Sequence, residues 1–279
     1  MPDASSAGSA SPAAASVRGI DLHIDRPHPA RIYDYFLGGK DNFPADRAAA
    51  EAAIQTTSNV RTGARENRAF MGRTMRCLAG ELGIRQFLDI GTGIPTSPNL
   101  HEIVQGITPE ARIVYVDNDP IVLTHARALL ASSAAGRVTY LDSDIRDVRA
   151  ILTSPQLTGT LDLTQPVALS LIAVLHFMEG DEPYAIVREL LDALVPGSYL
   201  VLSHGTADPD PVAKEVEDRY HQQGVSLKLR SRGEVQRLFD GLTLMEPGLQ
   251  IVHRWRPDAD TDLNLTDAEV CIYGAVGRK

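Results

Sequence analysis

Apolar and polar positions alternate regularly along most of the chain. From Phe87 onward, short apolar segments of strand length are separated by longer segments with helical periodicity. The apolar run from Val167 to Val174 is typical of a central strand that is buried on both faces of a parallel sheet. The other predicted strands are residues 112–117, 137–141, 198–203 and 269–276, with a β-like segment at 242–255 that Pro247-Gly248 interrupts. This pattern predicts an α/β fold with a doubly wound, mostly parallel sheet.

Helical patterns dominate the part of the chain before Phe87. We predict helices at residues 29–37, 44–55 and 58–82, and the glycines that follow the first and third of them are typical helix stops. Later helices are expected at 119–130, 181–194, 211–223 and after the capping box that joins Ser231 to Glu234. We therefore expect three regions, which are a disordered Ala/Ser-rich tail at 1–18, a helical cap or lid at 19–83 and one α/β domain at 84–279.

A glycine turn follows the first predicted strand. Asp89 ends that strand, Gly91 and Gly93 follow it, and Ser97-Pro98 is expected to begin the next helix. Strand, glycine turn and helix together are typical of a site for a nucleotide-like cofactor. The third glycine of a dinucleotide fingerprint is missing, because its position holds Thr96. An acid two residues before the first glycine suits a ligand with a cationic amino-acid end.

Acidic residues follow three successive predicted strands. Asp89 and Asp117 each lie at the end of a strand, and Asp144 lies just past the third. Because the carboxyl ends of parallel strands meet at one edge of a sheet, we expect these three carboxylates to line one ligand site. The alternative for any one of them is an ordinary helix cap or loop residue.

The glycine turn and its surroundings resemble a known enzyme class. The pattern D-x-G-x-G at residues 89–93 resembles motif I of class I S-adenosylmethionine-dependent methyltransferases. Nearly the whole chain beyond residue 18 is similar to one bacterial family of S-adenosyl methyltransferases, long catalogued as a domain of unknown function. The stretches that carry this resemblance are residues 26–43, 65–70, 87–96, 114–120 and 173–177. The resemblance implies a Rossmann-like, seven-stranded sheet with an antiparallel last strand, and S-adenosylmethionine as the cofactor, but no particular substrate.

Each candidate residue has an expected role toward that cofactor. Asp89 is expected to receive the ammonium of the methionine moiety, Asp117 the two ribose hydroxyls, and Asp144 the adenine amino group. Further cofactor-binding candidates are the turn residues Gly91, Thr92 and Gly93, Asn118 as a donor, Ile145 against the adenine ring, and Arg65, Asn67 and Arg68 near the methionine carboxylate. For the last three, a solvated helix face is the alternative.

His176 is the candidate catalytic residue. It follows the fourth strand in Val174-Leu-His-Phe177, and this placement is similar to the L-H-D-W stretch of small-molecule O-methyltransferases, in which the histidine is the general base. Imidazole titrates near neutral pH, which suits that role. Phe177 stands where those enzymes carry an acid, so a packing role beside the cofactor stays open. Tyr33 and His204 are candidates for lining the acceptor site.

Composition narrows the possible partners. The formal charge of −9 disfavours a nucleic-acid substrate, since phosphate binding needs a basic face. The longest apolar run, residues 167–178, is too short to span a bilayer, and no secretory signal is evident. Two cysteines, Cys77 and Cys271, predict neither a disulfide framework nor a metal cluster, and fit a reducing cytoplasmic setting. We expect no metal site and no membrane association.

These observations lead to one favoured function and two alternatives. We expect a methyltransferase that acts on an unidentified, small-molecule acceptor at oxygen or nitrogen. A nicotinamide-dependent oxidoreductase would be expected to show the third glycine and a tail that continues the parallel sheet. A non-catalytic protein that binds S-adenosylmethionine for regulation stays open, and turnover on an acceptor would distinguish it.

Overall fold

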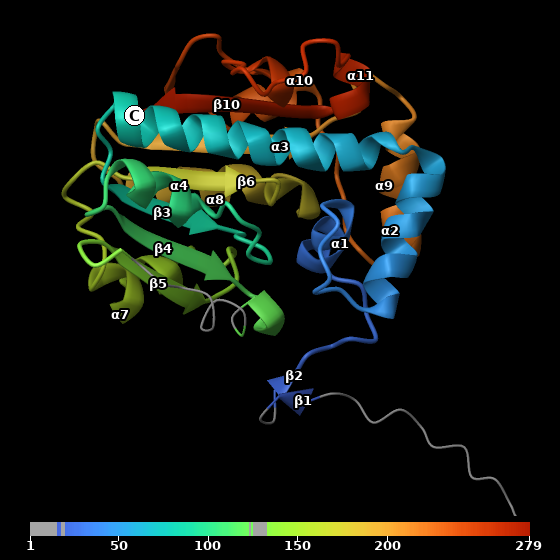
Figure 1. Cartoon of the computed structure of the whole chain (residues 1–279), viewed down its shortest axis with the longest axis horizontal. Helices are drawn as coiled ribbons and strands as arrows, with labels where there is room; N and C mark the ends of the chain where they lie inside the picture. Colours follow the sequence, from blue (N-terminus) through green and yellow to red (C-terminus); the bar gives the residue numbers. More distant parts are fainter. Residues whose placement is uncertain (1–15, 18–19, 123, 125–132) are drawn as a thin grey trace, which may run out of the picture.

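The computed structural model describes residues 16–17, 20–122, 124 and 133–279 (Figure 1). Its centre is an eight-stranded sheet with the order β5-β4-β3-β6-β7-β10-β8, in which β9 also pairs with β10. The strands of this sheet are β3 (Gln86–Ile90), β4 (Arg112–Asp117), β5 (Arg137–Asp142), β6 (Ala168–Ile172), β7 (Tyr199–Gly205), β8 (Thr243–Leu244), β9 (Gln250–Ile251) and β10 (Ile272–Arg278). Strands β3 to β7 are parallel and β10 is antiparallel to β7, which confirms the predicted Rossmann-like sheet with its antiparallel last strand.

Two short strands, rather than one long strand, form the edge of the sheet beside β10. The β-like segment predicted at 242–255 forms two short strands, β8 and β9, and both pair antiparallel with β10. Pro247 and Gly248 lie between them, where a proline cannot donate to a strand ladder and Gly248 has a φ of +81°. The sheet therefore has eight strands, because two short strands occupy the place of one. A separate hairpin pairs β1 (Ser16–Val17) with β2 (Ile20–Asp21).

The helices pack around this sheet and beyond one of its ends. They are α1 (Pro29–Phe36), α2 (Pro44–Thr56), α3 (Asn59–Arg76), α4 (Leu100–Ile107), α6 (Val148–Thr153), α7 (Pro155–Thr158), α8 (Glu182–Asp192), α9 (Ala213–Gln222), α10 (Arg232–Arg237) and α11 (Asp267–Val270). A π-helical turn (Cys77–Glu81) continues α3, and 3-10 turns form at Leu175–Phe177 and Val252–Arg254. None of the described helices is long and apolar enough to cross a membrane.

The main core lies between the sheet and its helices. Every residue of β3 is buried, and the sheet order places this strand between β4 and β6. On α3, Phe70 is fully buried and packs edge-to-face against Trp255, with 5.6 Å between the ring centroids. Helix α3, which runs across the sheet in Figure 1, therefore belongs to the main core. The division of the chain at residue 83 into a cap and a main domain stays a prediction.

A second apolar cluster joins the N-terminal helices to α9. Ile32 and Phe36 of α1 and the alanines of α2 pack with Val216 and Tyr220 of α9. Figure 1 shows α2 and α9 side by side, with α1 between them and the ends of the strands. The small side chains of Ala49, Ala50 and Ala53 allow the two helices to approach closely. This cluster holds α1 over the carboxyl edge of the sheet.

Two predicted boundaries are wrong. Helix α4 begins at Leu100 and not at Ser97-Pro98, because Asn99 and Glu102 form the capping box. The last strand begins at Ile272 and not at Glu269, because a second capping box between Thr266 and Glu269 starts the short helix α11. Of the helix predicted at 119–130, residues 120–122 are helical, and most of the rest lies outside the described residues.

Candidate functional site

A cavity of about 340 Å³ opens at the carboxyl edge of the sheet, within the range of about 300–1,000 Å³ that is usual for small-molecule sites. It lies where the strand order reverses between β3 and β6, which is the usual ligand position in such sheets. The structure brings ten of the eleven predicted cofactor-binding residues to its wall, namely Asn67, Arg68, Asp89, Gly91, Thr92, Gly93, Asp117, Asn118, Asp144 and Ile145. Arg65 is exposed and lies outside this wall, where its guanidinium contacts Thr62 at 3.4 Å.

The glycine turn requires its glycines. Gly91 and Gly93 have φ angles of +75° and +68°, a region that other residues rarely adopt. A Cβ on Gly91 would also lie 2.4 Å from Cγ2 of Val174, which no real side chain tolerates. The Gly91 amide donates to the carbonyl of Val116 at 2.8 Å, so the turn is fixed to the end of β4. The backbone of the turn therefore stays close to the cavity.

Asp117 is held in one orientation by backbone amides. Its Oδ2 accepts a hydrogen bond from the Gly93 amide at 2.8 Å, and its Oδ1 accepts one from the Asp119 amide at 2.9 Å. Burial raises the pKa of this carboxyl, and the two amide bonds lower it in part. Each carboxylate oxygen keeps one free lone pair, so Asp117 can still accept two hydroxyl groups from a ligand.

Asp89 is a buried carboxyl in the wall of the cavity. Burial raises its pKa to about 6, and the Ser170 hydroxyl and the Arg68 guanidinium oppose this shift. Among the described residues no cation forms an ion pair with Asp89. A cationic ligand group would therefore stabilise its ionised form.

Two side chains of α3, Asn67 and Arg68, line the cavity and differ in their hydrogen bonding. Asn67 is fully buried and donates from Nδ2 to the Tyr33 hydroxyl at 2.9 Å, while its Oδ1 has no partner among the described residues. Since the Tyr33 hydroxyl itself donates to the carbonyl of Ala64, the amide of Asn67 cannot be turned around to pair its oxygen. Arg68 donates to the carbonyls of Thr96 and Pro98 at 2.6 and 2.8 Å, so it fixes the loop after the glycine turn.

Asp144 and Asn118 form a further polar part of the cavity wall. Oδ2 of Asp144 accepts from Nδ2 of Asn118 at 3.0 Å, and Oδ1 accepts from the Arg146 amide at 2.9 Å. Arg146 also approaches Oδ1 with its guanidinium at 3.4 Å. Ile145 is buried and lines the cavity beside these groups. A flat ring with an amino group would find an apolar contact and an acceptor here.

His176 lies in a setting that does not favour the expected general base. Its Nδ1 accepts a hydrogen bond from the Gly205 amide at 3.2 Å, so the hydrogen of the neutral ring is on Nε2. Burial, with His204 and Arg230 adding to the effect, lowers the pKa of His176 well below its usual range. The nitrogen that would have to take a proton is therefore already occupied by a backbone donor.

His204, the other histidine in this region, is fully paired. Its Nδ1 donates to the carbonyl of Gly205 at 2.8 Å, and its Nε2 accepts from Arg230 at 3.0 Å. Burial lowers the pKa of His204 to about 3. It lines neither this cavity nor the second cavity described below, so the structure does not bring it to the expected acceptor site.

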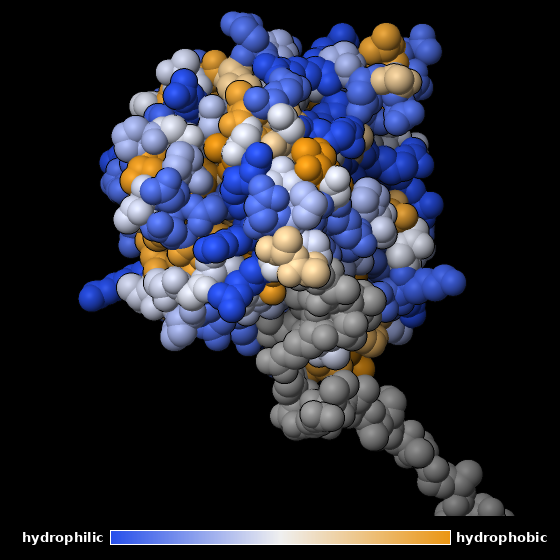
Figure 2. Space-filling model, turned by 60° about the vertical axis from the view of Figure 1, so that its left-hand side comes forward, coloured by the Kyte–Doolittle hydropathy of each residue, from blue (hydrophilic) through white to orange (hydrophobic). Residues whose placement is uncertain are grey.

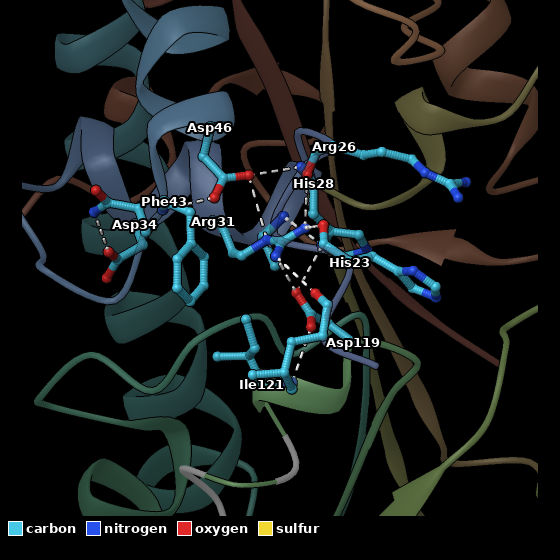
Figure 3. A network of polar contacts seen from close by, with 12 residues as sticks. His23, Arg26, His28, Arg31, Asp34, Phe43, Asp46, Asp119 and Ile121 are labelled. Atoms are coloured by element: carbon cyan, nitrogen blue, oxygen red, sulfur yellow. Dashed lines mark hydrogen bonds and ion pairs between the residues drawn. The ribbon is translucent and has the colours of Figure 1, made fainter. Parts of the chain in front are cut away.

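A buried charge network at the edge of the cavity was not foreseen from the sequence (Figure 3). The Nε of Arg31 on α1 lies 3.3 Å from Oδ1 of Asp46 on α2 and 3.6 Å from Oδ2 of Asp119, which follows β4. His28 adds its Nδ1 at 3.1 Å from the same Asp119 oxygen. Arg31 is only 2 % exposed, and the side chains of the two acids are 0 % and 2 % exposed.

This network places the start of α1 over the cavity. Arg31 also donates to the carbonyls of Leu22 and Arg26, and Asp46 accepts from the His28 amide at 2.8 Å. Residues 27–30 consequently line the cavity. Asp119 stands at the start of the helix predicted at 119–130, where its side chain accepts from the Ile121 amide, and its contacts with His28 and Arg31 of the N-terminal segment were not predicted. The sequence signal for this network was a charged residue among the apolar residues of each helix, Arg31 on α1 and Asp46 on α2.

Among the described residues, no group of three or more His, Cys, Asp or Glu side chains is arranged to hold a metal ion. The acids at 117, 119 and 144 are instead engaged by backbone amides and side-chain donors.

Comparisons with known proteins agree with this geometry. A family model described as S-adenosyl methyltransferase matches residues 15–279. The crystal structure of a DUF574 family protein from Streptomyces avermitilis is 49 % identical, with a TM-score of 0.90 over 92 % of this chain and 99 % of that one. A candidate methyltransferase from Thermobifida fusca is 40 % identical, with a TM-score of 0.86 over 92 % and 97 %.

A more distant structure shares the fold alone. An O-methyltransferase family protein from Burkholderia thailandensis is 15 % identical, with a TM-score of 0.50 over 82 % of this chain and 62 % of that one. None of the curated proteins compared with the chain matched it.

Proposed function

Because the chain belongs to the S-adenosyl methyltransferase family, we propose that it transfers the methyl group of S-adenosylmethionine to a small-molecule acceptor. The observation that carries this proposal is the meeting of Asp89, the glycine turn and Asp117 in one cavity at the switch point of the sheet. The cofactor supplies a methyl group that its sulfonium already activates. The task of the chain is therefore to hold that cofactor, position an acceptor and exclude water.

The residues present fit the cofactor. Asp89 would receive the ammonium, and the unpartnered Oδ1 of Asn67 offers a second acceptor in the same buried region. The Arg68 guanidinium would face the carboxylate. Asp117 would accept the ribose hydroxyls with the lone pairs that the Gly93 and Asp119 amides leave free.

The residues at the other part of the cavity wall fit the adenine of the cofactor. Asp144 would accept from the amino group, Asn118 orients that carboxylate at 3.0 Å, and Ile145 would pack on the ring. Residues 27–30 would cover the bound molecule, because the Arg31 network fixes them there. A buried carboxyl without a cationic partner and an unpartnered amide oxygen in one cavity are the pattern that the ammonium group of a ligand would satisfy.

A small acceptor is favoured over a macromolecule. The net charge of −9 opposes binding to nucleic acid. On the face shown in Figure 2, apolar side chains are scattered among hydrophilic ones, which does not favour a membrane or a large apolar partner. The cysteines Cys77 and Cys271 are both free, which supports a reducing, cytoplasmic location, and the similar structures come from bacteria.

The site leaves the methylated atom, oxygen or nitrogen, open. A non-catalytic role in binding S-adenosylmethionine is the second candidate, and the occupied Nδ1 of His176 is the observation that favours it. A turnover assay separates the two. The protein would be incubated with S-adenosylmethionine and a panel of phenols and amines, and formation of S-adenosylhomocysteine would be measured. Acceptor-dependent formation supports the enzyme, whereas tight binding of the cofactor with no turnover on any acceptor supports the regulatory role.

A further inference from the structure

A second cavity of about 130 Å³ adjoins the cofactor cavity. Pro29, Tyr33, Ala173 and Phe177 line both cavities, so the two share one wall. This shared wall lies at the end of β6, beside the glycine turn. A molecule in the second cavity would therefore lie next to a cofactor in the first.

The walls of the second cavity are mostly apolar. Separate parts of the chain supply these apolar side chains, among them Phe36 on α1, Val60 on α3, and Val216 on α9 together with Leu227 and Leu229 after it. In another protein, an engineered apolar cavity of about 150 Å³ binds benzene. The cavity of about 130 Å³ here accordingly has room for one ring or a branched aliphatic group of similar size.

The charge of the lining selects against anions. Among the described residues that line the second cavity there is no Lys or Arg, and the charged side chain is the carboxylate of Asp210. An acceptor with its own carboxylate or phosphate would lose its hydration and find no cation. A neutral acceptor avoids this cost.

Two buried polar groups in the lining lack partners. The hydroxyl of Tyr220, a residue that is 6 % exposed, forms no hydrogen bond with the described residues. His176, which is 9 % exposed, keeps its hydrogen on Nε2, and that atom also has no partner among the described residues. Both groups can donate to an oxygen or nitrogen of a ligand. Their presence in an apolar wall is typical of a specific small-molecule site.

We propose that this second cavity holds the methyl acceptor, and that the acceptor is a compact, neutral and mostly apolar molecule with a hydrogen-bond acceptor for Tyr220 or His176. The inference rests on the proposed function, because the first cavity must hold the cofactor. In this arrangement Nε2 of His176 is a hydrogen-bond donor toward the acceptor and not a general base. Tyr33 and Phe177 form the passage through which the acceptor meets the methyl group.

The test uses two probes of the same shape, benzamide and benzoate. Their binding to the full chain, saturated with S-adenosylhomocysteine, is measured by ligand-observed NMR. We expect benzamide to bind in the millimolar range or better and benzoate to bind at least about 10-fold more weakly, as an uncompensated buried charge requires. No detectable benzamide binding, or equal binding of the two probes, overturns the proposal.

Variants locate the binding site. Val216→Trp and Val60→Phe fill the cavity from two different helices and are expected to weaken benzamide binding at least about 10-fold. Tyr220→Phe removes one donor and is expected to weaken it about 2- to 10-fold. The matched control Leu263→Trp adds the same side chain at a site that is 75 % exposed, and should change nothing. Undiminished binding to both filled variants would place the probe elsewhere and contradict the proposal.

A titration with S-adenosylhomocysteine separates this proposal from the previous one. Each filled variant should keep the affinity of the wild type for S-adenosylhomocysteine within about 2-fold, because the substituted residues do not line the first cavity. This also shows that the variants are folded. If the wild type itself fails to bind S-adenosylhomocysteine, the proposed function fails, and benzamide binding measured without it still decides whether the second cavity selects neutral rings.

Discussion

The backbone amide of Gly93 donates a hydrogen bond to the carboxylate of Asp117, with 2.8 Å between N and Oδ2. The glycine turn and the second acidic residue of the site are therefore one unit, although 24 positions separate them in sequence. The bond fixes the carboxylate before any ligand arrives, and the carboxylate fixes the turn in return. Such preorganisation reduces the ordering cost of binding.

The turn itself gives the first prediction. Gly91→Ala combines a left-handed φ of +75° with a Cβ only 2.4 Å from Val174. The strain of about 1–2 kcal/mol and the overpacking of about 1–3 kcal/mol should together lower the free energy of unfolding by about 3 kcal/mol. Urea denaturation followed by circular dichroism measures this change.

A matched glycine separates the two causes. Gly180 has a φ of +56°, and a Cβ there would have nothing within 4 Å. Gly180→Ala should therefore cost only about 1 kcal/mol. Equal losses in the two variants would show that crowding by Val174 is unimportant.

The buried network around Arg31 gives the second prediction. Arg31→Met leaves the carboxylates of Asp46 and Asp119 buried without their cation, which should cost about 3–5 kcal/mol of unfolding free energy. The affinity for S-adenosylhomocysteine, measured by calorimetry, should also fall, because residues 27–30 lose their anchor over the cavity.

An exposed arginine is the control for this variant. Arg76 pairs with Asp258 at 2.7 Å on the surface, where its side chain is 52 % exposed. Arg76→Met should cost less than about 1 kcal/mol. The account of the network is wrong if Arg31→Met is as stable as Arg76→Met and binds S-adenosylhomocysteine like the wild type.

The titration of Asp89 gives a prediction about pH. Burial raises its pKa to about 6 in the folded protein, so the free folded state binds more protons than the unfolded state between about pH 4 and 6. Asp89 therefore destabilises the free protein progressively as the pH rises through this window. Asp89→Asn should remove this part of the pH dependence from urea denaturation curves.

The affinity for the ligand should change with pH in the opposite direction to the stability of the free protein. An ammonium binds the ionised carboxylate, so the affinity for S-adenosylhomocysteine should rise about 10-fold from about pH 5 to about pH 7 and then level off. Calorimetric titrations across this range measure it. A wild-type profile that is as flat as that of Asp89→Asn would mean that Asp89 does not contact the ammonium.

The ring of His176 gives a spectroscopic prediction. Since Nδ1 accepts from the Gly205 amide and burial lowers the pKa of the ring, His176 should stay neutral with hydrogen on Nε2 at the pH of about 6.5 where a free imidazole titrates. Nitrogen-15 NMR of the imidazole distinguishes the two neutral tautomers and the cation. A titration near neutral pH, or hydrogen on Nδ1, would restore the general base as the better interpretation.

The sequence predicted those features that depend on local pattern. Strand ends, the glycine turn and the acids at 89, 117 and 144 follow from residue periodicity and from the rule that parallel strands end at one edge. The error in the predicted start of α4 also has a local cause. The sequence offers two helix-start signals close together, Ser97-Pro98 and the pair Asn99 and Glu102, and only the second forms a capping box.

Features that depend on long-range contact could not be predicted in this way. The Arg31 network joins residues 15 and 88 positions away along the chain, and no local pattern reports such a meeting. The tautomer of His176 depends on the Gly205 amide of a different strand, which sequence spacing does not reveal. The second cavity likewise exists only after α1, α3 and α9 have come together.

The most direct test of the central claim is calorimetric titration of S-adenosylmethionine and S-adenosylhomocysteine into the wild type, Asp117→Ala and Asp142→Ala. Asp117 and Asp142 are register partners on β4 and β5, but Asp117 lines the cavity and Asp142 is exposed outside it. We predict micromolar binding by the wild type and Asp142→Ala, and about 100-fold weaker binding by Asp117→Ala, as the loss of two charge-assisted hydrogen bonds requires. A folded wild type that binds neither molecule, or an Asp117→Ala variant that binds as tightly as the wild type, would contradict the account.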